Sequence, residues 1–312
     1  MARVDPVITE LLDILSNRSY TTSELRNALG ISQETLKEYL DVLKSKGIKL
    51  GETQDGLTIK DVSGFNEITI QYGLQAPFSI EYHESLASTN DRAADLAADG
   101  IFDIAIIADK QTAGQGRQGR TWESPTGGVW MSLSLSPDID SHLFPLLSLG
   151  AGVAIVQTLR DMNISAYLKW PNDVLVGDEG VRGGRKIAGI LARSESHDWV
   201  VLGMGINANI PARSLPDGAT SIQEVSGTVN RRSIVQNILE HFTTLRDEPS
   251  RIREKWRTLS TTLNTEIQVT TTNQTYTGIA SDISEAGALI INTDEGQITI
   301  TAGDCTHLRP LE

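Results

Sequence analysis

The sequence predicts an α+β protein built from three segments of different character. Residues 5–61 place apolar side chains at helical spacing, the stretch 79–262 mixes strand-like with helical runs, and 263–312 holds short runs rich in β-branched residues. Each of these patterns is typical of a different local architecture. We therefore predict a helical domain over residues 1–62, a mixed α/β domain over 79–262 and a small β-barrel over 263–312.

The first segment has the element order of a winged helix-turn-helix domain. It holds three stretches with helical spacing. We expect Thr22 or Ser23 to cap the second, Gly30 to end it, and Ser32 to cap the third. The run IKLGETQDGLTIKD then predicts a hairpin with Asp55-Gly56 in its turn. Two helices joined by the short connection LGIS form a helix-turn-helix, and the hairpin supplies the wing.

The expected recognition helix of this domain carries charges of both signs. Gln33, Thr35 and Lys37 are the candidate DNA contacts, because amide, hydroxyl and ammonium groups can reach base edges or phosphates. The carboxylates on the same helix repel phosphate, so a protein-contact role for the domain stays open. Residues 62–78 are expected to form a connector to the middle segment.

Composition limits the class of protein. The chain has 312 residues and a formal net charge of −13, which argues against a surface that binds nucleic acid or anionic membranes throughout. The single cysteine, Cys305, excludes an internal disulfide, and the histidines show no metal-ligand spacing. We expect no signal peptide and no stretch near the roughly 18 apolar residues of a membrane span. The expectation is a cytoplasmic protein without a membrane partner.

Two stretches of this acidic chain carry basic residues and no carboxylate. They are KQTAGQGRQGR over 110–120 and RGGRKIAGILAR over 182–193. Glycines let backbone N–H groups turn toward an anion, and arginines add paired hydrogen bonds to phosphate. The loop is neither a Walker loop nor a dinucleotide fingerprint, and a flexible solvated turn is the alternative interpretation. Together the two stretches predict a site for a nucleotide phosphate or an acyl phosphate.

Two short runs add weight to such a site. KWPND, over 169–173, follows a strand-like segment and predicts a rigid turn at a strand end. In GRKIAGIL, Lys186 precedes small and apolar residues, so we expect its ammonium group at one end of a buried strand. A lysine that extends to solvent is the ordinary alternative to a functional cation.

The same runs, with two more, are similar to the motifs of biotin–protein ligases. STN, QTAGQGRQGR, KWPND, RKIAGIL and GMGINAN follow in the order and approximate spacing of that family, at 88–90, 111–120, 169–173, 185–191 and 203–209. With its N-terminal domain, the whole chain resembles a bifunctional biotin ligase and biotin operon repressor. The resemblance implies a central catalytic domain related to class II synthetases and a C-terminal SH3-like barrel.

The resemblance implies an ATP-dependent reaction in two steps. Such enzymes join the carboxylate of biotin to the α-phosphate of ATP, and a lysine of a biotin carboxyl carrier protein then attacks the biotinoyl-5′-AMP. The substrates supply the nucleophiles, so the enzyme supplies positioning and charge stabilisation. By resemblance, Lys186 contacts the carboxylate and the α-phosphate, while Arg117 and Arg120 hold phosphate or support the loop. Mg²⁺ is expected with the pyrophosphate, but the sequence identifies no metal ligands.

The resemblance also implies a biotin pocket. Ser88, Thr89 and Gln111 are expected to bond the ureido ring, which needs paired polar contacts in an apolar slot. Asn90 is expected either to join them or to cap the helix that begins there. Three residues of the glycine loop are expected to close over biotin as the loop becomes ordered: Gln115, Gly116 and Arg117.

The sequence departs from the family pattern at two positions near the nucleotide. Many relatives carry arginine where Gln115 stands, and some stack adenine on a tryptophan where Ala219 stands. Trp130 is then the candidate for stacking, with a place in the core as its equal alternative, and Trp122 is expected to be structural. The other nucleotide candidates are Asn172, for which a turn-forming role is the alternative, Asn207 and Asn209.

Two other functions stay open from the sequence. One is a transcriptional regulator that senses biotin or its adenylate and transfers nothing. The other is a lipoate or octanoate transferase, against which KWPND and GQGRQGR argue. The expected partners are the carrier protein and operator DNA. Because one winged helix discriminates weakly between DNA sequences, we expect a homodimer that the bound adenylate promotes.

Overall fold

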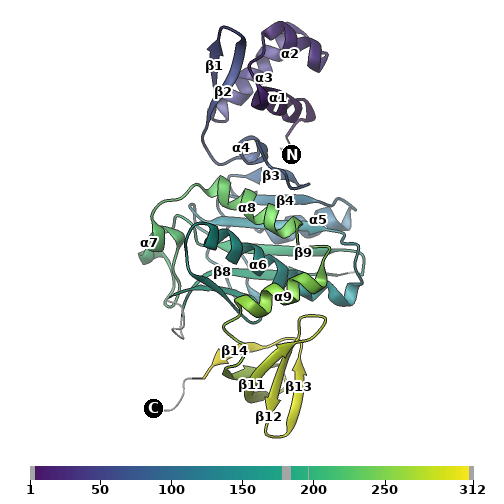
Figure 1. The fold of residues 1–312 in the computed structure, drawn as a ribbon, viewed down its shortest axis with the longest axis vertical. Coiled ribbons are helices and arrows are strands. Elements are labelled where there is room, and N and C mark those ends of the chain that lie inside the picture. The colour runs from purple at the N-terminus through teal and green to yellow at the C-terminus, as the bar shows by residue number, and fades with distance from the viewer. Residues whose placement is uncertain (1–3, 178–183, 196, 309–312) are drawn as a thin grey trace.

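The computed structural model describes residues 4–177, 184–195 and 197–308, and it has three parts along its longest axis (Figure 1). A helical domain with a two-stranded wing lies at one end. A seven-stranded sheet with helices lies in the middle, and a five-stranded sheet lies at the other end. The α+β class predicted from the sequence is confirmed.

The N-terminal part has the predicted winged helix-turn-helix order. Its elements are α1 (Pro6–Asn17), α2 (Thr22–Leu29), α3 (Gln33–Ser45), β1 (Ile48–Thr53) and β2 (Gly56–Val62). Leucines on one face of each helix are buried together with Ile48 of the wing. Each helix buries a single stripe against the others, which is why helical periodicity is visible in this part of the sequence.

The cap of α2 differs by one residue from the prediction. Thr21 caps the helix, not Thr22 or Ser23, and it forms a capping box with Glu24. The carboxylate of Glu24 accepts from the N–H of Thr21, and the hydroxyl of Thr21 accepts from the N–H of Glu24. Gly30 ends the helix in the left-handed region, with φ at +65°, as predicted.

The wing turn is also displaced by one residue. Ser32 caps α3 as predicted, but the hairpin turn consists of Gln54 and Asp55, and Gly56 opens β2. Gly56 has φ at +119°, and a Cβ atom there would lie 2.1 Å from the backbone oxygen of Tyr20. Glycine is therefore required by both the backbone conformation and the close approach of the chain.

The connector forms a short helix that joins the winged helix to the middle of the molecule. α4 (Glu67–Gln71) is capped by Asn66, whose side-chain amide also donates to Lys46 O at 2.9 Å. The carboxylate of Glu67 is buried and lies 2.7 Å from Lys46 Nζ. On its other side, this segment accepts two hydrogen bonds on backbone carbonyls from Gln236 Nε2. The connector is therefore a docked element and not a free linker.

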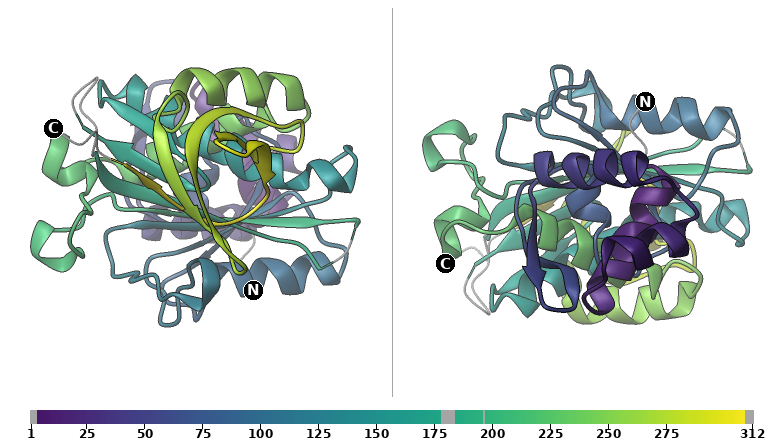
Figure 2. Two further views of the ribbon diagram at one scale, coloured as in Figure 1. Left: turned by 90° about the horizontal axis from the view of Figure 1, so that it is seen from below. Right: turned by 90° about the horizontal axis from the view of Figure 1, so that it is seen from above.

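The central part is a seven-stranded sheet with helices on both faces. Its strands, in the order in which they pair, are β3 (Ser79–His83), β4 (Ile104–Ala108), β5 (Val129–Leu135), β9 (Val200–Ile206), β8 (Arg185–Arg193), β7 (Asp173–Val176) and β6 (Ala166–Lys169). Its helices are α5 (Thr89–Ala98), α6 (Phe144–Asp161), α7 (Ile222–Ser226), α8 (Arg231–Thr243) and α9 (Pro249–Leu259). β3 and β4 are parallel, and the other neighbouring pairs are antiparallel. Figure 2 shows α5 on one face of the sheet and α6, α8 and α9 on the other.

Helix α6 belongs to a longer apolar stretch than we expected anywhere in the chain. The segment Ser141–Asp161 is long and apolar enough to cross a membrane by length and composition, so the expectation that no stretch approaches that length was wrong. In the structure 72% of its most apolar window is buried inside the protein. α6 packs against the sheet, α8 and α9. Burial on several sides explains an apolar surface that extends around the helix.

The C-terminal part is a five-stranded antiparallel sheet, formed by the short β-branched runs for which the sequence predicted a small barrel; the β-sheet character is confirmed, and closure into a barrel stays a prediction. Its strands pair in the order β13 (Gly296–Ile300), β12 (Leu289–Thr293), β11 (Thr275–Ile283), β10 (Glu266–Thr270) and β14 (Asp304–His307). Its apolar core is continuous with that of the central part. The indole N–H of Trp170 donates to Gly287 O at 3.3 Å across this junction. The small sheet is thereby held against the central part.

Candidate active site

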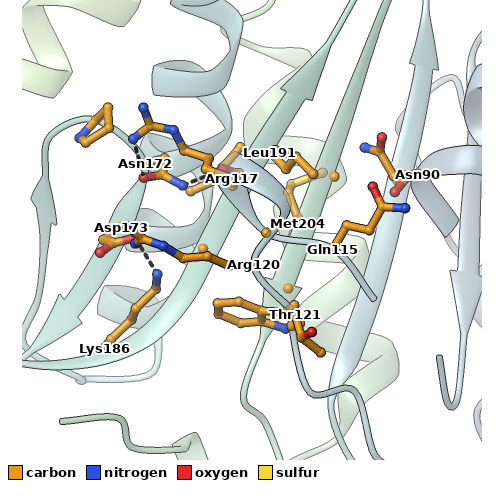
Figure 3. A pocket seen from close by; sticks show the side chains of 18 of the residues that line it. Asn90, Gln115, Arg117, Arg120, Thr121, Asn172, Asp173, Lys186, Leu191 and Met204 are labelled. Carbon is orange, nitrogen blue, oxygen red and sulfur yellow. Dashed lines mark hydrogen bonds and ion pairs between the residues drawn. The ribbon is translucent and has the colours of Figure 1, made fainter. Parts of the chain in front are cut away.

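One cavity of about 510 Å³ brings most of the predicted site residues together. It is lined from the start of α5, the glycine loop, β5, the turn between β6 and β7, β8, β9 and β14. In Figure 3, Arg117 and Lys186 lie toward one end, and Asn90 and Gln115 lie at the other. The two basic stretches of the sequence therefore meet in one place; Arg182 alone of their basic residues lies outside the described part of the chain.

The floor of the pocket consists of glycines on β8 and β9. A Cβ atom on Gly205 would lie 2.6 Å from Trp122 Nε1, and one on Gly189 would lie 3.1 Å from the same ring. A Cβ atom on Gly203 would lie 2.8 Å from Asn90 Nδ2. The lack of side chains at these three positions lets Trp122 and Asn90 approach the sheet closely, and it keeps space for a ligand.

Short polar side chains form one end of the pocket. Gln111 Oε1 accepts from the backbone N–H of Thr89 at 2.8 Å and from its hydroxyl at 3.1 Å. Gln111 Nε2 donates to Ser124 Oγ at 2.9 Å, and Ser132 Oγ lies 2.8 Å from Thr89 Oγ1. Ser88 lies next to this set and lines the cavity too. The result is a fixed arrangement of donors and acceptors in an otherwise apolar slot.

Two buried donors of the pocket have no partner within the described residues. The sequence left open whether Asn90 caps α5, but Ser88 has that role, with its hydroxyl accepting from the N–H of Asp91. The Nδ2 atom of Asn90 and the Nε1 atom of Trp122 are both buried without an acceptor. Both residues line the cavity. Because an unsatisfied buried donor costs free energy, the pair indicates that a ligand supplies acceptors here.

Helix α5, which begins at this polar end, is anchored to β3 by a buried ion pair. Arg92 Nε and Nη2 donate to the two carboxylate oxygens of Glu81 at 2.7 and 3.1 Å, and His83 Nε2 lies 2.9 Å from Glu81 Oε1. Burial pulls the pKa of Glu81 upward, but the hydrogen bonds from Arg92 and His83 outweigh it, so the pKa lies below its ordinary value.

Replacing Arg92 by methionine should lower the free energy of unfolding by about 3 kcal/mol at neutral pH, because the change leaves a buried carboxylate without its main partner. A carboxyl group whose pKa is lowered by folding stabilises the protein above its unfolded pKa of about 4.3 and loses that contribution as the pH falls through the folded value. The difference between the two proteins should therefore shrink below about pH 4. Chemical unfolding at a series of pH values measures it, and a constant difference would contradict the assignment.

Lys186 organises the charged end of the pocket. Its Nζ atom lies 2.6 Å from Asp173 Oδ1 and 5.1 Å from the centroid of the Trp122 ring. Lys186 is on β8 and Asp173 is the first residue of β7, so pairing of these two strands sets the distance. Figure 3 shows the two side chains pointing toward each other. An ammonium group has three donors, and the carboxylate uses only one of them here.

The glycine loop contacts the C-terminal sheet, which the sequence did not predict. Arg117 Nη1 donates to Asn172 Oδ1 at 3.4 Å and to a backbone carbonyl just before β14 at 3.2 Å, and Arg120 pairs with Asp304 of β14. Burial lowers the pKa of Arg117, whereas the charges of Asp304 and Asp173 act in the opposite direction. The loop has no carboxylate near it in the sequence, but the tertiary structure supplies two.

Three family models match the chain, one in each of its parts. The biotin/lipoate A/B protein ligase family matches residues 85–207, the biotin protein ligase C-terminal domain matches 262–308, and the arsR family of bacterial regulatory proteins matches 5–48. The bifunctional ligase/repressor BirA of Bacillus subtilis is 32% identical over 95% of this chain and 96% of its own length. The chain belongs to the biotin protein ligase family.

Two further members of this family are similar over less of the chain. The biotin–[acetyl-CoA-carboxylase] ligase of Mycobacterium tuberculosis is 32% identical over 72% of this chain and 88% of its own. A structure of biotin protein ligase from Aquifex aeolicus in complex with biotin and ATP covers 74% of this chain and 98% of its own, with 28% identity and a TM-score of 0.61. The biotin ligase fold is therefore supported by both sequence and structure.

Most of the residues predicted to contact substrates line the cavity of this ligase. They are Ser88, Thr89, Asn90, Gln111, Gln115, Gly116, Arg117, Arg120, Asn172 and Lys186. The structure shows the turn-forming role of Asn172, and its contact with ATP stays a prediction. Its Nδ2 atom donates to Ile190 O at 2.8 Å and thereby holds the turn, while the same residue accepts a hydrogen bond from Arg117.

Three of the predicted nucleotide contacts do not line the cavity. Trp130 is fully buried in the core, where its indole N–H donates to Pro125 O, so it is not placed to stack on adenine. Asn207 and Asn209 use their side-chain amides to donate to backbone carbonyls of other loops. Trp122, which we expected to be structural, is instead a wall of the ligase pocket. The residues next to Trp122 and Trp130 in the sequence do not show which of the two tryptophans lines the pocket and which lies in the core.

Sequence reasoning missed the wall that the C-terminal sheet supplies. Asp304, Cys305 and Thr306 line the cavity from β14, and no local pattern links them to the glycine loop. Burial raises the pKa of the Cys305 thiol to about 11, so this cysteine is a neutral wall group and not a nucleophile. Lys169 and Asp173 also line the cavity, and KWPND already contained the signal for both.

The predicted DNA contacts lie on the first turns of α3. Gln33 and Lys37 are exposed, and Thr35 is half-buried beside the Ser32 cap. Arg26 Nη1, from α2, lies 3.5 Å from Gln33 Oε1, which adds a positive charge next to the start of α3. This surface is compatible with insertion of α3 into a groove of DNA.

Proposed function

We propose that the protein joins biotin to ATP and transfers biotin from the resulting biotinoyl-5′-AMP to a lysine of a biotin carboxyl carrier protein. The observation that carries this proposal is the presence, in one cavity, of Lys186 and Arg117 toward one end and of Asn90, which directly follows Thr89 of the polar set, at the other (Figure 3). The cations suit a carboxylate and a phosphate, and the polar set suits a ureido ring.

Biotin binds with its ureido ring at the polar end. The ring needs acceptors and donors in a narrow slot, and the unpartnered amide of Asn90 supports this orientation because it offers a donor that the protein does not use. The apolar chain of biotin lies on the glycine floor beside Trp122. Its carboxylate then extends toward Lys186, at the opposite end of the cavity.

Adenylation is a displacement at phosphorus. One carboxylate oxygen of biotin attacks the α-phosphorus of ATP, the bond between that phosphorus and the bridging oxygen breaks, and pyrophosphate leaves. Two anions approach each other in this step, so fixed positive charge lowers its barrier. Lys186 neutralises the charge where the carboxylate meets the α-phosphate, and Arg117 and Arg120 bind phosphate oxygens.

Transfer is an aminolysis of the mixed anhydride. The neutral amine of the carrier lysine attacks the carbonyl carbon, the bond from that carbon to the phosphate oxygen breaks, AMP leaves with the electron pair, and the amine releases a proton. No side chain of the ligase becomes covalently attached. The closed glycine loop holds the anhydride and keeps water away until the carrier arrives.

We propose that Mg²⁺ accompanies ATP. Among the described residues, no group of three His, Cys, Asp or Glu side chains forms a protein cage for a metal ion. The pocket has two carboxylates, and each already pairs with a cation: Asp173 with Lys186 and Asp304 with Arg120. This donor set fits an ion that takes most of its oxygens from phosphates and water and one from Asp173. Such an ion would neutralise the departing pyrophosphate.

We further propose that the protein acts in the cytoplasm and that each of its three parts has its own function. Residues 1–62 bind operator DNA through Gln33, Thr35 and Lys37, residues 79–262 catalyse both steps, and residues 263–312 complete the pocket. Bound adenylate promotes a homodimer, so that two winged helices read two half-sites. Because phosphate contacts release counterions, the affinity for the operator falls steeply with salt.

Incubation of the full chain with biotin, ATP and a carrier domain tests the catalytic proposal. We expect the carrier to gain the mass of one biotinoyl group on a lysine, with one AMP and one pyrophosphate released. A regulator that only senses biotin would bind the vitamin and leave the carrier unlabelled. Lipoate in place of biotin tests the transferase alternative, and labelling by lipoate but not by biotin would exclude the biotin ligase function.

A further inference from the structure

Strand β4 is held at both ends by arginines arranged in the same way. Arg231, the first residue of α8, pairs with Asp109 after the strand, and Arg246, just beyond α8, pairs with Asp103 before it. Each guanidinium group also lies over a phenylalanine ring, at 4.1 Å for Arg231 and 5.6 Å for Arg246. The two sites differ in their surroundings, because only the end held by Arg231 leads into the ligand pocket.

Arg231 joins the ends of two neighbouring strands. Its Nη1 atom donates to Asp109 Oδ1 at 2.6 Å and to Gly128 O at 3.1 Å. Asp109 follows β4 directly, and Gly128 directly precedes β5. The side chains of Arg231 and Asp109 are 16% and 20% exposed, so water screens the pair only weakly. Loss of the guanidinium group would leave a largely buried carboxylate and a carbonyl without their donor.

The two segments that Arg231 joins carry residues that build the polar end of the pocket. Gln111 lies two positions beyond Asp109 and accepts both hydrogen bonds from Thr89. Ser132 lies on β5 and contacts the hydroxyl of the same threonine. Neither Arg231 nor Asp109 is among the residues that line the cavity. Any effect of Arg231 on a ligand is therefore indirect, and Gln111 and Ser132 are polar pocket residues on the two segments that it joins.

The face of the Arg231 guanidinium contacts the connector to the winged helix. Phe65, between β2 and α4, lies under it at 4.1 Å and packs edge-on against Tyr82 at 5.8 Å. The next residue, Asn66, caps α4 and donates to Lys46 O at the end of α3. One guanidinium group thus contacts the two pocket strands and the segment that carries the DNA-binding domain.

We propose that Arg231 is a positioning residue for biotin: it fixes the end of β4 and the start of β5, the two segments that hold Gln111 and Ser132 against Thr89, and its contact with Phe65 makes the affinity for biotin depend on the connector. The inference rests on the proposed biotin ligase function. Arginine suits this position because its planar group bridges two acceptors at its edge while its face stacks on an aromatic ring. Lysine keeps the charge but cannot make all three contacts.

Titration calorimetry of the full chain with biotin alone tests the first half of the proposal. Arg231→Gln should weaken biotin binding about tenfold or more, which corresponds to about 1.4 kcal/mol. Arg246→Gln is the matched control, since it removes the same kind of contact from the far end of β4, and its biotin affinity should stay within about twofold of the parent protein.

In carrier labelling, Arg231→Gln should raise KM for biotin while kcat at saturating biotin changes less than about threefold. Arg231→Lys should fold with its charge pair intact and still bind biotin severalfold more weakly.

Phe65→Ala tests the second half. It should weaken biotin binding in the same direction, and its effect should be much smaller when Arg231 is already glutamine, because both changes disrupt one contact. Phe78→Ala, the equivalent change beside Arg246, should leave biotin binding unchanged.

Strictly additive effects of Phe65→Ala and Arg231→Gln would overturn the link to the connector. Parent-like affinity in folded Arg231→Gln and Arg231→Lys, or an equal loss in Arg246→Gln, would overturn the positioning role. If the parent protein neither binds biotin nor labels a carrier, the proposed function fails instead.

Discussion

Replacing Lys186 by alanine should slow the formation of biotinoyl-5′-AMP by about a hundredfold to a thousandfold, while the protein stays folded. Loss of one preorganised charge at the reacting atoms has an effect of this size in other active sites. The fold should tolerate the change because Lys186 and its partner Asp173 both line the cavity, where water can reach the carboxylate that remains, and the change creates no large void in the core. Release of pyrophosphate at saturating biotin and ATP measures the rate.

Arg185 provides the control for this variant. It precedes Lys186 on β8, its side chain is 52% exposed, and it pairs with Glu224 at 3.4 Å. Arg185 is not among the residues that line the cavity. Arg185→Ala should therefore leave adenylate formation within about twofold of the parent protein. A native rate in Lys186→Ala would show that another group stabilises the charge of the transition state, and the assigned role of Lys186 would be wrong.

Replacing Trp170 by alanine should lower the free energy of unfolding by about 3–5 kcal/mol, the range for truncating a large core aromatic. Trp170 is 2% exposed, its backbone N–H donates to Thr262 Oγ1 at 3.0 Å, and its indole reaches Gly287 O of the C-terminal sheet. The residue also lines the cavity. The variant should therefore raise KM for ATP as well as lower stability, because β14 with Asp304 is no longer held firmly beside the glycine loop.

Trp256 separates these two effects. It is 1% exposed on α9 and belongs to the same core, but it is absent from the lining of the cavity. Trp256→Ala should lose a similar amount of stability, measured by urea unfolding with circular dichroism. At a temperature where both variants are folded, its KM for ATP should stay close to that of the parent protein. An equal rise of KM in both variants would mean that general loosening, and not the junction at Trp170, controls ATP binding.

The sequence predicted the parts of the fold that depend on local periodicity and on backbone requirements. The stripes of the three N-terminal helices, the left-handed Gly30 and the cap at Ser32 were all readable, because each depends on residues within one or two helical turns. Lys186 could also be placed at the end of a strand from its immediate neighbours. The family motifs located most of the pocket because they are short runs that the fold brings to one place.

Contacts between distant segments could not be predicted in this way. Trp122 and Trp130 are eight positions apart, and only the glycines of β8 and β9 decide that the first lines the pocket, whereas β5 buries the second. The Asp304 partner of Arg120 comes from the other end of the chain. The helical connector was missed because a stretch this short has too few turns to show periodicity, and its helix is stabilised by docking.

The sequence by itself determined the order of the three parts, most of their helices and strands, and which basic and polar residues are candidates to bind a biotin adenylate. Those properties are local, since side-chain chemistry and backbone preference are set within a few residues. Only the tertiary structure decided which of these residues share a cavity, which carboxylates face the arginines, and that Arg231 connects the pocket to the winged helix. These outcomes depend on strand pairing and core packing between segments that are separated in the sequence, by 22 residues for Thr89 and Gln111 and by 184 for Arg120 and Asp304, and no local pattern encodes such contacts.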